Sequence, residues 1–236
     1  MINRELLRSE SAKIDISLDD TALARFDEYA RLLIEWNNNI NLTSITTPDE
    51  IVTKHFVDSL SILKYVDIPD GASIIDVGTG AGFPGMPLLI ARPDINITFL
   101  DSLKKRLGFI DEVLNVNSLS ACLVHGRAED MGNTADYRER FDFATARAVA
   151  PLNVLCEYCM PFVKVGGRFV SMKGASARDE LDCAKTAIAT LGGELESFFD
   201  FNLANGDKRS IIIIKKVSQT PTNYPRRSKK IDTKPL

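Results

Sequence analysis

The sequence predicts an α/β fold built on a seven-stranded, mainly parallel β-sheet whose last two strands form an antiparallel hairpin. Two observations predict this fold. From residue 71 onward, short β-branched segments alternate with helical segments, and such repetition requires crossovers that place helices on both faces of a parallel sheet. The last two apolar segments are separated only by the loop 203–209, which is too short for a crossover, so they are expected to pair antiparallel.

Residues 1–70 are expected to form a helical extension that packs on this core. Residues 17–20 resemble a capped helix start, and the apolar residues that follow share one helix face: Leu23, Phe26, Ala30 and Leu33. A capping box follows, with Thr47 as N-cap, Pro48 at the first helical position and Glu50 reaching back. The second helix is expected to bury Val52, Phe56, Leu60 and Leu63.

Residues 71–217 are expected to form the core. Parallel strands are predicted at residues 73–77, 96–100, 121–124, 141–145 and 168–172. Helices are predicted near residues 87–91, 103–115, 151–163 and 177–191. The hairpin strands are predicted at residues 195–201 and 210–217. Parallel strands closed by a hairpin resemble the sheet of a methyltransferase, whereas a dehydrogenase sheet continues in parallel.

The composition is that of one globular domain, with 44% hydrophobic and 26% charged residues in a chain of 236. No apolar run approaches the roughly 20 residues that cross a bilayer. Charged residues are spread over residues 1–20, which excludes a secretory signal there. The chain is therefore expected to stay in the cytoplasm, without a membrane partner.

Four cysteines suit reduced thiols rather than a disulfide framework: Cys122, Cys156, Cys159 and Cys183. Cys156 and Cys159 form a lone CxxC on one face of a predicted helix. With no second pair to complete a metal site, they are expected to be buried core thiols, and no metal is predicted.

The C-terminal tail, residues 218–236, differs in charge from the rest of the chain. The whole sequence has a net charge of −3, which taken alone argues against a nucleic-acid partner. The tail, however, contains only one acidic residue, Asp232, and five basic ones: Arg226, Arg227, Lys229, Lys230 and Lys234. It is either a solvated terminus without a partner or a segment that contacts phosphates.

A glycine-rich loop follows the first predicted strand and begins the next helix, where bare backbone and helix N–H groups approach a ligand. Glycines at positions 80, 82 and 85 match the dinucleotide pattern GxGxxG, so a nicotinamide-dependent oxidoreductase must be considered. Two features disfavour it. Pro84 and Pro87 remove N–H donors that a pyrophosphate needs, and the spacing counted from Gly78 is GxGxG, followed by Phe83.

Read from Asp76, the loop is Asp-x-Gly-x-Gly-x-Gly, with glycines at Gly78, Gly80 and Gly82. This pattern resembles the first motif of the class I methyltransferases, whose cofactor carries no phosphate. The sequence therefore predicts a Rossmann-like methyltransferase core that binds S-adenosyl-L-methionine at these glycines.

Acidic residues after the next two strands extend the predicted cofactor site. Asp101, with Ser102 beside it, stands where a carboxylate accepts hydrogen bonds from ribose hydroxyls. Ala128 and Glu129 stand where methyltransferases of this class bind adenine through a backbone amide and a carboxylate.

The segment after the fourth strand bears on the methyl acceptor. Residues 144–151 contain neither the Asn/Asp-Pro-Pro-aromatic motif of an exocyclic-amine methylase nor the cysteine nucleophile of a cytosine-C5 enzyme. Lys173, at the end of the fifth strand, could match a lysine of the Lys-Asp-Lys-Glu set of the ribose methylases. Arg147, however, stands where that set has its aspartate, which excludes this class. Guanine N7 offers a lone pair and carries no proton, so its methylation requires alignment rather than a base.

Two further segments are far more specific than the glycine loop, which many methyltransferases share. They are residues 55–59, with the sequence His-Phe-Val-Asp-Ser, and residues 224–227, with the sequence Tyr-Pro-Arg-Arg. Through these and through segments 36–43, 101–106, 127–129, 146–148 and 173–174, the chain resembles the ribosomal small-subunit methyltransferase G family, also called glucose-inhibited division protein B. The resemblance implies a bacterial enzyme that methylates N7 of one guanine in the decoding-region loop of 16S rRNA. It also implies a cofactor site that includes Gly78, Phe83, Ala128, Glu129 and Arg147.

Other candidate residues are polar. Lys54, His55 and Asp58 lie within one helical turn and form either a functional cluster or a solvated helix face. No catalytic residue is certain, since no base is needed; the candidates are His55, Asp58, Arg147 and Lys173. The RNA-binding candidates are Lys54, Lys173, Arg226 and Arg227.

Three alternatives stay open from the sequence. They are a small-molecule methyltransferase, a nicotinamide-dependent oxidoreductase, and a ribosome-binding module without activity. The expected partner is 16S rRNA or the assembled small ribosomal subunit, and the chain is expected to act as a monomer.

Overall fold

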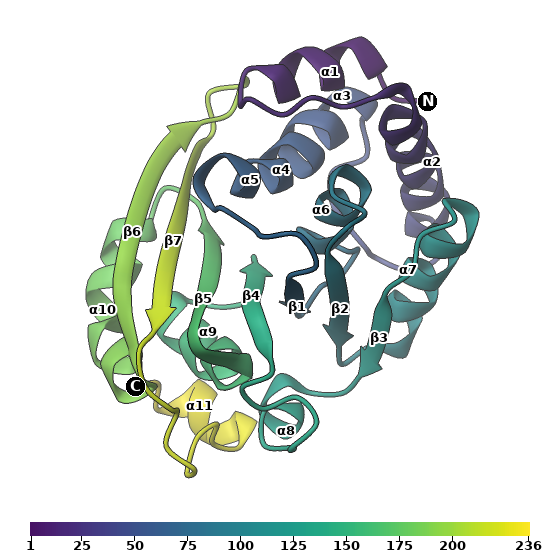
Figure 1. The fold of residues 1–236 in the computed structure, drawn as a ribbon. Helices are drawn as coiled ribbons and strands as arrows, with labels where there is room; N and C mark the ends of the chain where they lie inside the picture. The colour runs from purple at the N-terminus through teal and green to yellow at the C-terminus, as the bar shows by residue number, and fades with distance from the viewer.

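The computed structural model describes all residues 1–236, and its strands form one seven-stranded sheet in the order β3-β2-β1-β4-β5-β7-β6 (Figure 1). Strands β1 to β5 run parallel, whereas β7 runs antiparallel to both β5 and β6. The predicted sheet and its edge hairpin are confirmed. The strands are β1 (Ser73–Val77), β2 (Asn96–Asp101), β3 (Cys122–His125), β4 (Phe141–Arg147), β5 (Val163–Lys173), β6 (Gly193–Asn202) and β7 (Lys208–Lys216).

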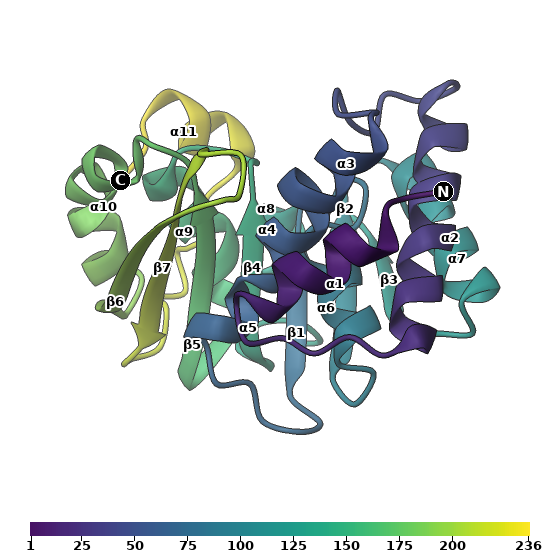
Figure 2. The same cartoon turned by 90° about the horizontal axis from the view of Figure 1, so that it is seen from above.

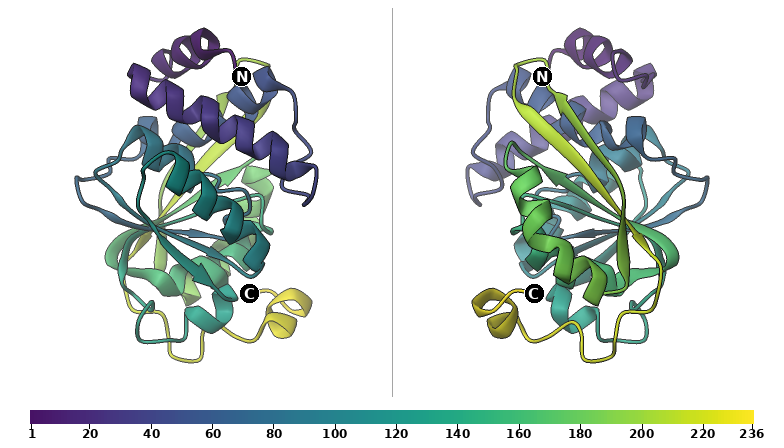
Figure 3. Two further views of the ribbon diagram at one scale, coloured as in Figure 1. Left: turned by 90° about the vertical axis from the view of Figure 1, so that its right-hand side faces the viewer. Right: turned by 90° about the vertical axis from the view of Figure 1, so that its left-hand side faces the viewer.

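Helices cover both faces of the sheet and give the molecule three layers (Figures 2 and 3). None of the helices combines the length and apolarity that a membrane crossing requires. Before β1 lie α1 (Arg4–Ala12), α2 (Asp20–Asn37), α3 (Pro48–Ile51), the π-helix η1 (Val52–Val57), α4 (Asp58–Leu60) and α5 (Ile62–Tyr65). After β1 lie α6 (Gly85–Ala91), α7 (Lys104–Val116), α8 (Ala128–Met131), α9 (Leu152–Cys159), the 3-10 helix η2 (Met160–Phe162), α10 (Ala177–Thr190) and α11 (Ser228–Thr233).

The two faces of the sheet have separate hydrophobic cores. Along β7, Ile211 and Ile213 pack in the cluster that contains the N-terminal helices and α7, while Ile212 and Ile214 pack in the cluster that contains α9 and α10. Successive side chains of a strand point to opposite faces, so a strand that is covered on both sides reads as a continuous apolar run.

The N-terminal helices belong to the first of these cores. Phe26 of α2 and Phe56 of η1 are buried with their ring centroids 4.8 Å apart, and Tyr29 stacks on Phe56 at 5.4 Å. Because one cluster spans these helices and the sheet, the predicted division of the chain at residues 70 and 217 stays a prediction.

Two local expectations are wrong. The helix predicted for residues 151–163 ends at Cys159, because Pro161 lacks the N–H that would continue it, and β5 begins already at Val163. Thr47 does precede the first residue of α3, but its side chain caps no backbone N–H. Instead its hydroxyl donates to the carboxylate of Glu50 at 2.7 Å, so a side-chain pair replaces the capping box.

The direction in which the chain moves across the sheet reverses between β1 and β4. At such a point the loops that follow the two neighbouring strands turn to opposite faces, which opens a crevice at the carboxyl ends of the strands. The glycine loop follows β1 and residues 148–151 follow β4, so both border this crevice.

Candidate active site: two adjoining pockets

The glycine loop is held from behind by Asp76, the fourth residue of β1. The buried carboxylate of Asp76 accepts hydrogen bonds from the hydroxyl of Thr79 at 2.6 Å and the N–H of Gly85 at 3.0 Å. Burial raises the pKa of Asp76 to about 6, against these hydrogen bonds. A Cβ on Gly85 would lie 2.6 Å from the ring of Phe99 and 2.9 Å from Asp76, so this glycine is required by packing.

Gly78 turns the chain out of β1 and faces the crevice. Its φ is +67°, a conformation that favours glycine, and its N–H donates to the carbonyl of Leu100 at 2.9 Å. A Cβ at this position would lie 2.9 Å from a methyl group of Val149. Bare backbone is therefore required on this side of the crevice.

A first pocket of about 400 Å³ lies between the ends of β1, β2 and β3, and its volume suits a small ligand. Five of the residues predicted for the cofactor line it: Gly78, Asp101, Ser102, Ala128 and Glu129. The buried carboxylate of Asp101 accepts from the N–H groups of Gly80 and Leu103, each at 2.9 Å, and keeps lone pairs for a further donor. The side chain of Glu129, at the start of α8, is buried at the pocket without a protein hydrogen-bond partner.

Four other residues predicted for the cofactor do not line this pocket. Gly80 acts through its N–H on Asp101. A Cβ on Gly82 would lie 3.1 Å from the hydroxyl of Tyr29, so this glycine gives room to α2. The ring of Phe83 lies against the guanidinium of Arg147, which is 4.5 Å from the ring centroid. Both residues contact His55 rather than the first pocket.

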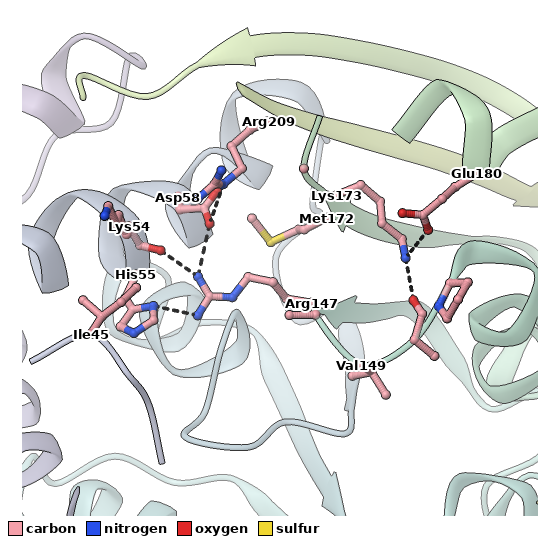
Figure 4. Close-up of a pocket in the computed structure, with 14 residues that line it drawn as sticks. Ile45, Lys54, His55, Asp58, Arg147, Val149, Met172, Lys173, Glu180 and Arg209 are labelled. Carbon is pink, nitrogen blue, oxygen red and sulfur yellow. Dashed lines mark hydrogen bonds and ion pairs between the residues drawn. The ribbon is translucent and has the colours of Figure 1, made fainter. Parts of the chain in front are cut away.

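A second pocket of about 520 Å³ adjoins the first, and Arg147 at the end of β4 is its centre (Figure 4). The guanidinium donates to the carbonyl of Lys54 at 3.1 Å, to the carboxylate of Asp58 at 3.2 Å and to Nδ1 of His55 at 3.0 Å. Burial lowers the pKa of Arg147, and Asp58 opposes that shift, so the guanidinium stays charged.

The π-helix η1 and its continuation α4 supply all three of these acceptors. Single π-helical turns inside α-helices often occur at functional sites. The helical cluster predicted from Lys54, His55 and Asp58 therefore faces the sheet, and Arg147 joins it to β4.

His55 is a neutral hydrogen-bond relay in this pocket. Burial and the charge of Arg147 lower its pKa from 6.5 to about 3. Its Nδ1 accepts from Arg147, so the proton is on Nε2, which donates to the hydroxyl oxygen of Thr43 at 2.8 Å. Its ring stacks on Phe83 with centroids 4.3 Å apart.

Asp58 is only 3% exposed and lies between two arginines. One of its carboxylate oxygens, Oδ2, is 3.2 Å from Arg147 and 3.3 Å from Arg209 of β7. The other, Oδ1, is buried without any hydrogen-bond partner. Arg209 was not predicted, because nothing in the hairpin sequence indicates that its side chain reaches the crevice.

The ammonium group of Lys173, at the end of β5, contacts other groups of the protein. Its ammonium group donates to the carbonyl of Ala150 at 2.6 Å and pairs with Glu180 at 2.8 Å. Glu180 in turn accepts from the N–H of Leu152 at 2.9 Å. This pair fixes the segment after β4.

Ala148 and Val149, which follow Arg147 directly, line both pockets. Ala148 has a φ of +56°, which turns the chain sharply between the pockets, and Val149 is 41% exposed. A ligand in one pocket therefore borders a ligand in the other across these two residues. The arrangement suits direct transfer of a small group between two bound molecules.

The tail is packed rather than solvated, which corrects that interpretation. Arg226 pairs with the buried Glu157 of α9 at 2.6 Å, whereas Arg227 is exposed. Cys156 and Cys159 are buried in the core with raised thiol pKa values, which confirms the interpretation of the lone CxxC. No three His, Cys, Asp or Glu side chains are grouped so as to hold a metal ion.

Residues 22–212 match the family model described as rRNA small subunit methyltransferase G. The chain belongs to this family. Proteins named ribosomal RNA small subunit methyltransferase G are 46% identical to it in Desulforamulus reducens (94% of this chain, 93% of that one) and 45% identical in Leuconostoc mesenteroides (100% of both). The family match confirms the resemblance predicted from the sequence.

Solved structures support the fold at low identity. TrmN from Thermus thermophilus has a TM-score of 0.54 at 18% identity, over 68% of this chain and 48% of its own. TYW2 from M. jannaschii, solved in complex with AdoMet, has a TM-score of 0.52 at 12% identity, over 63% of this chain and 70% of its own. The class I methyltransferase fold is thereby confirmed, and S-adenosylmethionine is the methyl donor of this family.

We expect Gly78→Ala to weaken the binding of S-adenosylhomocysteine at least tenfold, because the added methyl group pushes Val149 toward the first pocket. Isothermal titration calorimetry measures this. The matched control is Gly71→Ala, whose φ is +73° but whose Cβ would meet nothing within 4 Å. Both changes carry a backbone cost of about 1 kcal/mol, so equal affinities of the two variants would contradict the pocket assignment.

We expect His55 to stay neutral from pH 5 to pH 8. Its pKa of about 3 lies below this window, since burial and Arg147 disfavour the imidazolium. Ring-proton and ring-nitrogen NMR shifts should show the Nε2–H tautomer throughout. A midpoint near 6.5 would mean that the imidazole is solvated and does not accept from Arg147.

Proposed function

We propose that this protein transfers a methyl group from S-adenosylmethionine to N7 of a guanine in the decoding-region loop of 16S rRNA. The observation that carries the proposal is that a cofactor-sized pocket and a cationic pocket share one wall, Ala148 and Val149. Membership of the family supports the same conclusion, since the relatives are named ribosomal RNA small subunit methyltransferase G.

The second pocket suits a polyanion. Four cationic side chains line it, against the carboxylates of Asp58 and Glu180: Lys54, Arg147, Lys173 and Arg209. The surplus of positive charge favours a nucleotide over an uncharged metabolite. This supports RNA over the small-molecule alternative.

The same pocket offers no free base. His55 accepts from Arg147 through the nitrogen that would otherwise take a proton. Asp58 is paired with two arginines through Oδ2, while its unpartnered Oδ1 is buried, and Glu180 is paired with Lys173. An acceptor that must lose a proton would need one of these groups, whereas guanine N7 loses none. The pocket therefore favours an N7 acceptor.

Residues of the first pocket fit the cofactor. The Asp101 carboxylate has lone pairs for the ribose hydroxyls, and Glu129, with the N–H of Ala128, has the donor and acceptor that an adenine edge requires. When bound, the cofactor supplies an electrophilic methyl group on a sulfonium. Ala148 and Val149 then fix the distance at which the guanine lies, which is the alignment that direct transfer needs.

Lys54 and Arg227 remain our candidates for RNA phosphate contacts. Lys54 lines the second pocket, with its ammonium group paired to Glu50, whose side chain is 45% exposed, and Arg227 is exposed on the tail. Lys173 and Arg226 are not proposed as RNA contacts, because Glu180 and Glu157 occupy their cationic groups. An rRNA substrate implies action in the bacterial cytoplasm, and we propose that the chain works there as a monomer.

The proposal predicts that labelled S-adenosylmethionine transfers its methyl group to 16S rRNA, or to small subunits that lack the mark. Mass mapping of the product should find a single N7-methylguanine in the decoding-region loop. The Gly78→Ala variant serves as the cofactor-deficient control. Label in neither substrate, with cofactor binding intact, would overturn the proposal.

We expect Asp58→Asn to lower kcat by about a hundredfold while the affinity for S-adenosylhomocysteine changes less than twofold. The change leaves Arg147 and Arg209 without their shared carboxylate, and breaking such a buried pair costs roughly 3–5 kcal/mol of stability. Urea unfolding and steady-state kinetics measure both effects.

The matched control is Asp207→Asn, since Asp207 also pairs with Arg209, at 3.6 Å, but its side chain is 42% exposed. It should change stability by less than about 1 kcal/mol. If Asp58→Asn kept wild-type kcat, Asp58 and the two arginines that it pairs with would have no part in holding the guanine.

A further inference from the structure

We propose that the C-terminal tail, residues 218–236, braces the helices that line one side of the first pocket and thereby sets the affinity for the cofactor. The inference rests on the proposed cofactor pocket. It differs from both interpretations of the tail that the sequence left open, a solvated terminus and a segment that contacts phosphates. The tail crosses the molecule beside α8 and α9, and α11 lies against α9 (Figures 1 and 3). These two helices supply one side of the pocket.

The first connection runs through the loop that follows α8. The side-chain amide of Asn133 donates both to the carbonyl of Glu129, at 2.9 Å, and to the carbonyl of Pro225 in the tail, at 3.1 Å. One amide therefore joins the tail to the residue of α8 that faces the adenine side of the pocket.

Arg138 reinforces this connection. Its guanidinium donates to three tail carbonyls, those of Thr220 at 2.7 Å, Tyr224 at 2.8 Å and Pro221 at 3.2 Å, and to Gly132 at 3.1 Å. Since Gly132 directly follows α8, the tail backbone and the end of this helix share one cation.

The second connection is the pair of Arg226 and Glu157. Glu157 is 0% exposed and accepts hydrogen bonds from Nε and Nη2 of Arg226, at 2.8 and 2.6 Å, as well as from its backbone N–H at 2.8 Å. A buried carboxylate is costly unless such a partner satisfies it. The tail is therefore required for α9 to keep Glu157 inside, and the next residue of α9 is Tyr158.

Tyr158 is the third connection, and it touches the pocket itself. It lines the first pocket, and its hydroxyl is 3.1 Å from Oδ1 of Asp232 on α11. Burial raises the pKa of Tyr158 to about 12, so the hydroxyl keeps its proton and donates to Asp232. The tail thus holds a ring that forms part of the cofactor site.

The tail has an inner and an outer face. Ile231 is fully buried and Arg226 points inward, whereas Arg227, Lys229 and Lys230 are exposed. The contacts described above come from Arg226, from Asp232 and from backbone carbonyls of the tail, and none comes from Arg227, Lys229 or Lys230. Any contact with RNA phosphates belongs to the outer face, so substitutions separate the two roles.

Isothermal titration of the full-length chain with S-adenosylhomocysteine tests the inference. We expect Arg226→Ala to weaken binding about tenfold and Arg226→Lys to recover part of it, because lysine restores the charge without the two-pronged geometry. The KM for S-adenosylmethionine should rise in parallel, with kcat at saturating cofactor and the KM for RNA unchanged. The matched control, Lys229→Ala on the outer face, should bind S-adenosylhomocysteine like the wild type.

Two milder variants guard against a global loss of structure in Arg226→Ala. Tyr158→Phe and Asp232→Ala each remove the same hydrogen bond, and each should weaken S-adenosylhomocysteine binding about threefold. The double variant should bind no more weakly than Asp232→Ala, since the hydrogen bond between the two side chains can be lost only once. Thermal unfolding without ligand should change little in all three.

Unchanged affinity in Arg226→Ala and in the Tyr158 and Asp232 variants would overturn the inference. Weaker 16S rRNA binding with unchanged S-adenosylhomocysteine affinity would also overturn it and make the tail an RNA contact only. The titration uses no RNA. A wild-type chain that failed to methylate 16S rRNA would therefore refute the proposed function. The inference about the tail would still be decided by the S-adenosylhomocysteine titration.

Discussion

The charge of Arg147 is the constraint on which the site depends. Its guanidinium is buried at the end of β4, where only the carboxylate of Asp58, the carbonyl of Lys54 and the imidazole of His55 can satisfy it. All three belong to the N-terminal helices. These helices must therefore dock on the sheet in one register, and their docking closes the second pocket. The same guanidinium covers Phe83, so the glycine loop and the N-terminal helices are aligned by one side chain.

This arrangement also explains why two pockets share a thin wall. Ala148 and Val149 follow Arg147 directly, so the side chain that anchors the second pocket also fixes where the chain leaves β4. Lys173 and Glu180 hold the other end of that segment through Ala150 and Leu152. A segment tied at both ends cannot drift toward either pocket. Methyl transfer between two bound molecules needs such a fixed separation more than it needs a proton acceptor.

The sequence was sufficient to predict the sheet, its edge hairpin and five of the residues that line the first pocket, because these follow from local signals. Asp101 ends β2 and Glu129 lies four residues after β3, and parallel strands bring their carboxyl ends together. The sequence did not indicate which charges are paired. Arg226 and Glu157 are 69 residues apart, and neither has a local motif that names the other. Arg209 and Tyr158 were missed for the same reason, since their roles arise only when β7 and the tail are packed.

Buried charge pairs, rather than apolar contacts, position the movable parts of the site. Asp58 joins Arg147 to Arg209, Glu180 holds Lys173, and Glu157 holds Arg226. Apolar residues of similar size often stabilise a fold as well as a buried ion pair does, so stability alone does not explain these pairs. A pair differs in that it has one satisfied geometry, while apolar side chains tolerate many. Each pair joins an element that lines a pocket to a neighbouring element: β4 and β7 to α4, β5 to α10, and α9 to the tail. A small displacement of these elements would misalign methyl donor and acceptor.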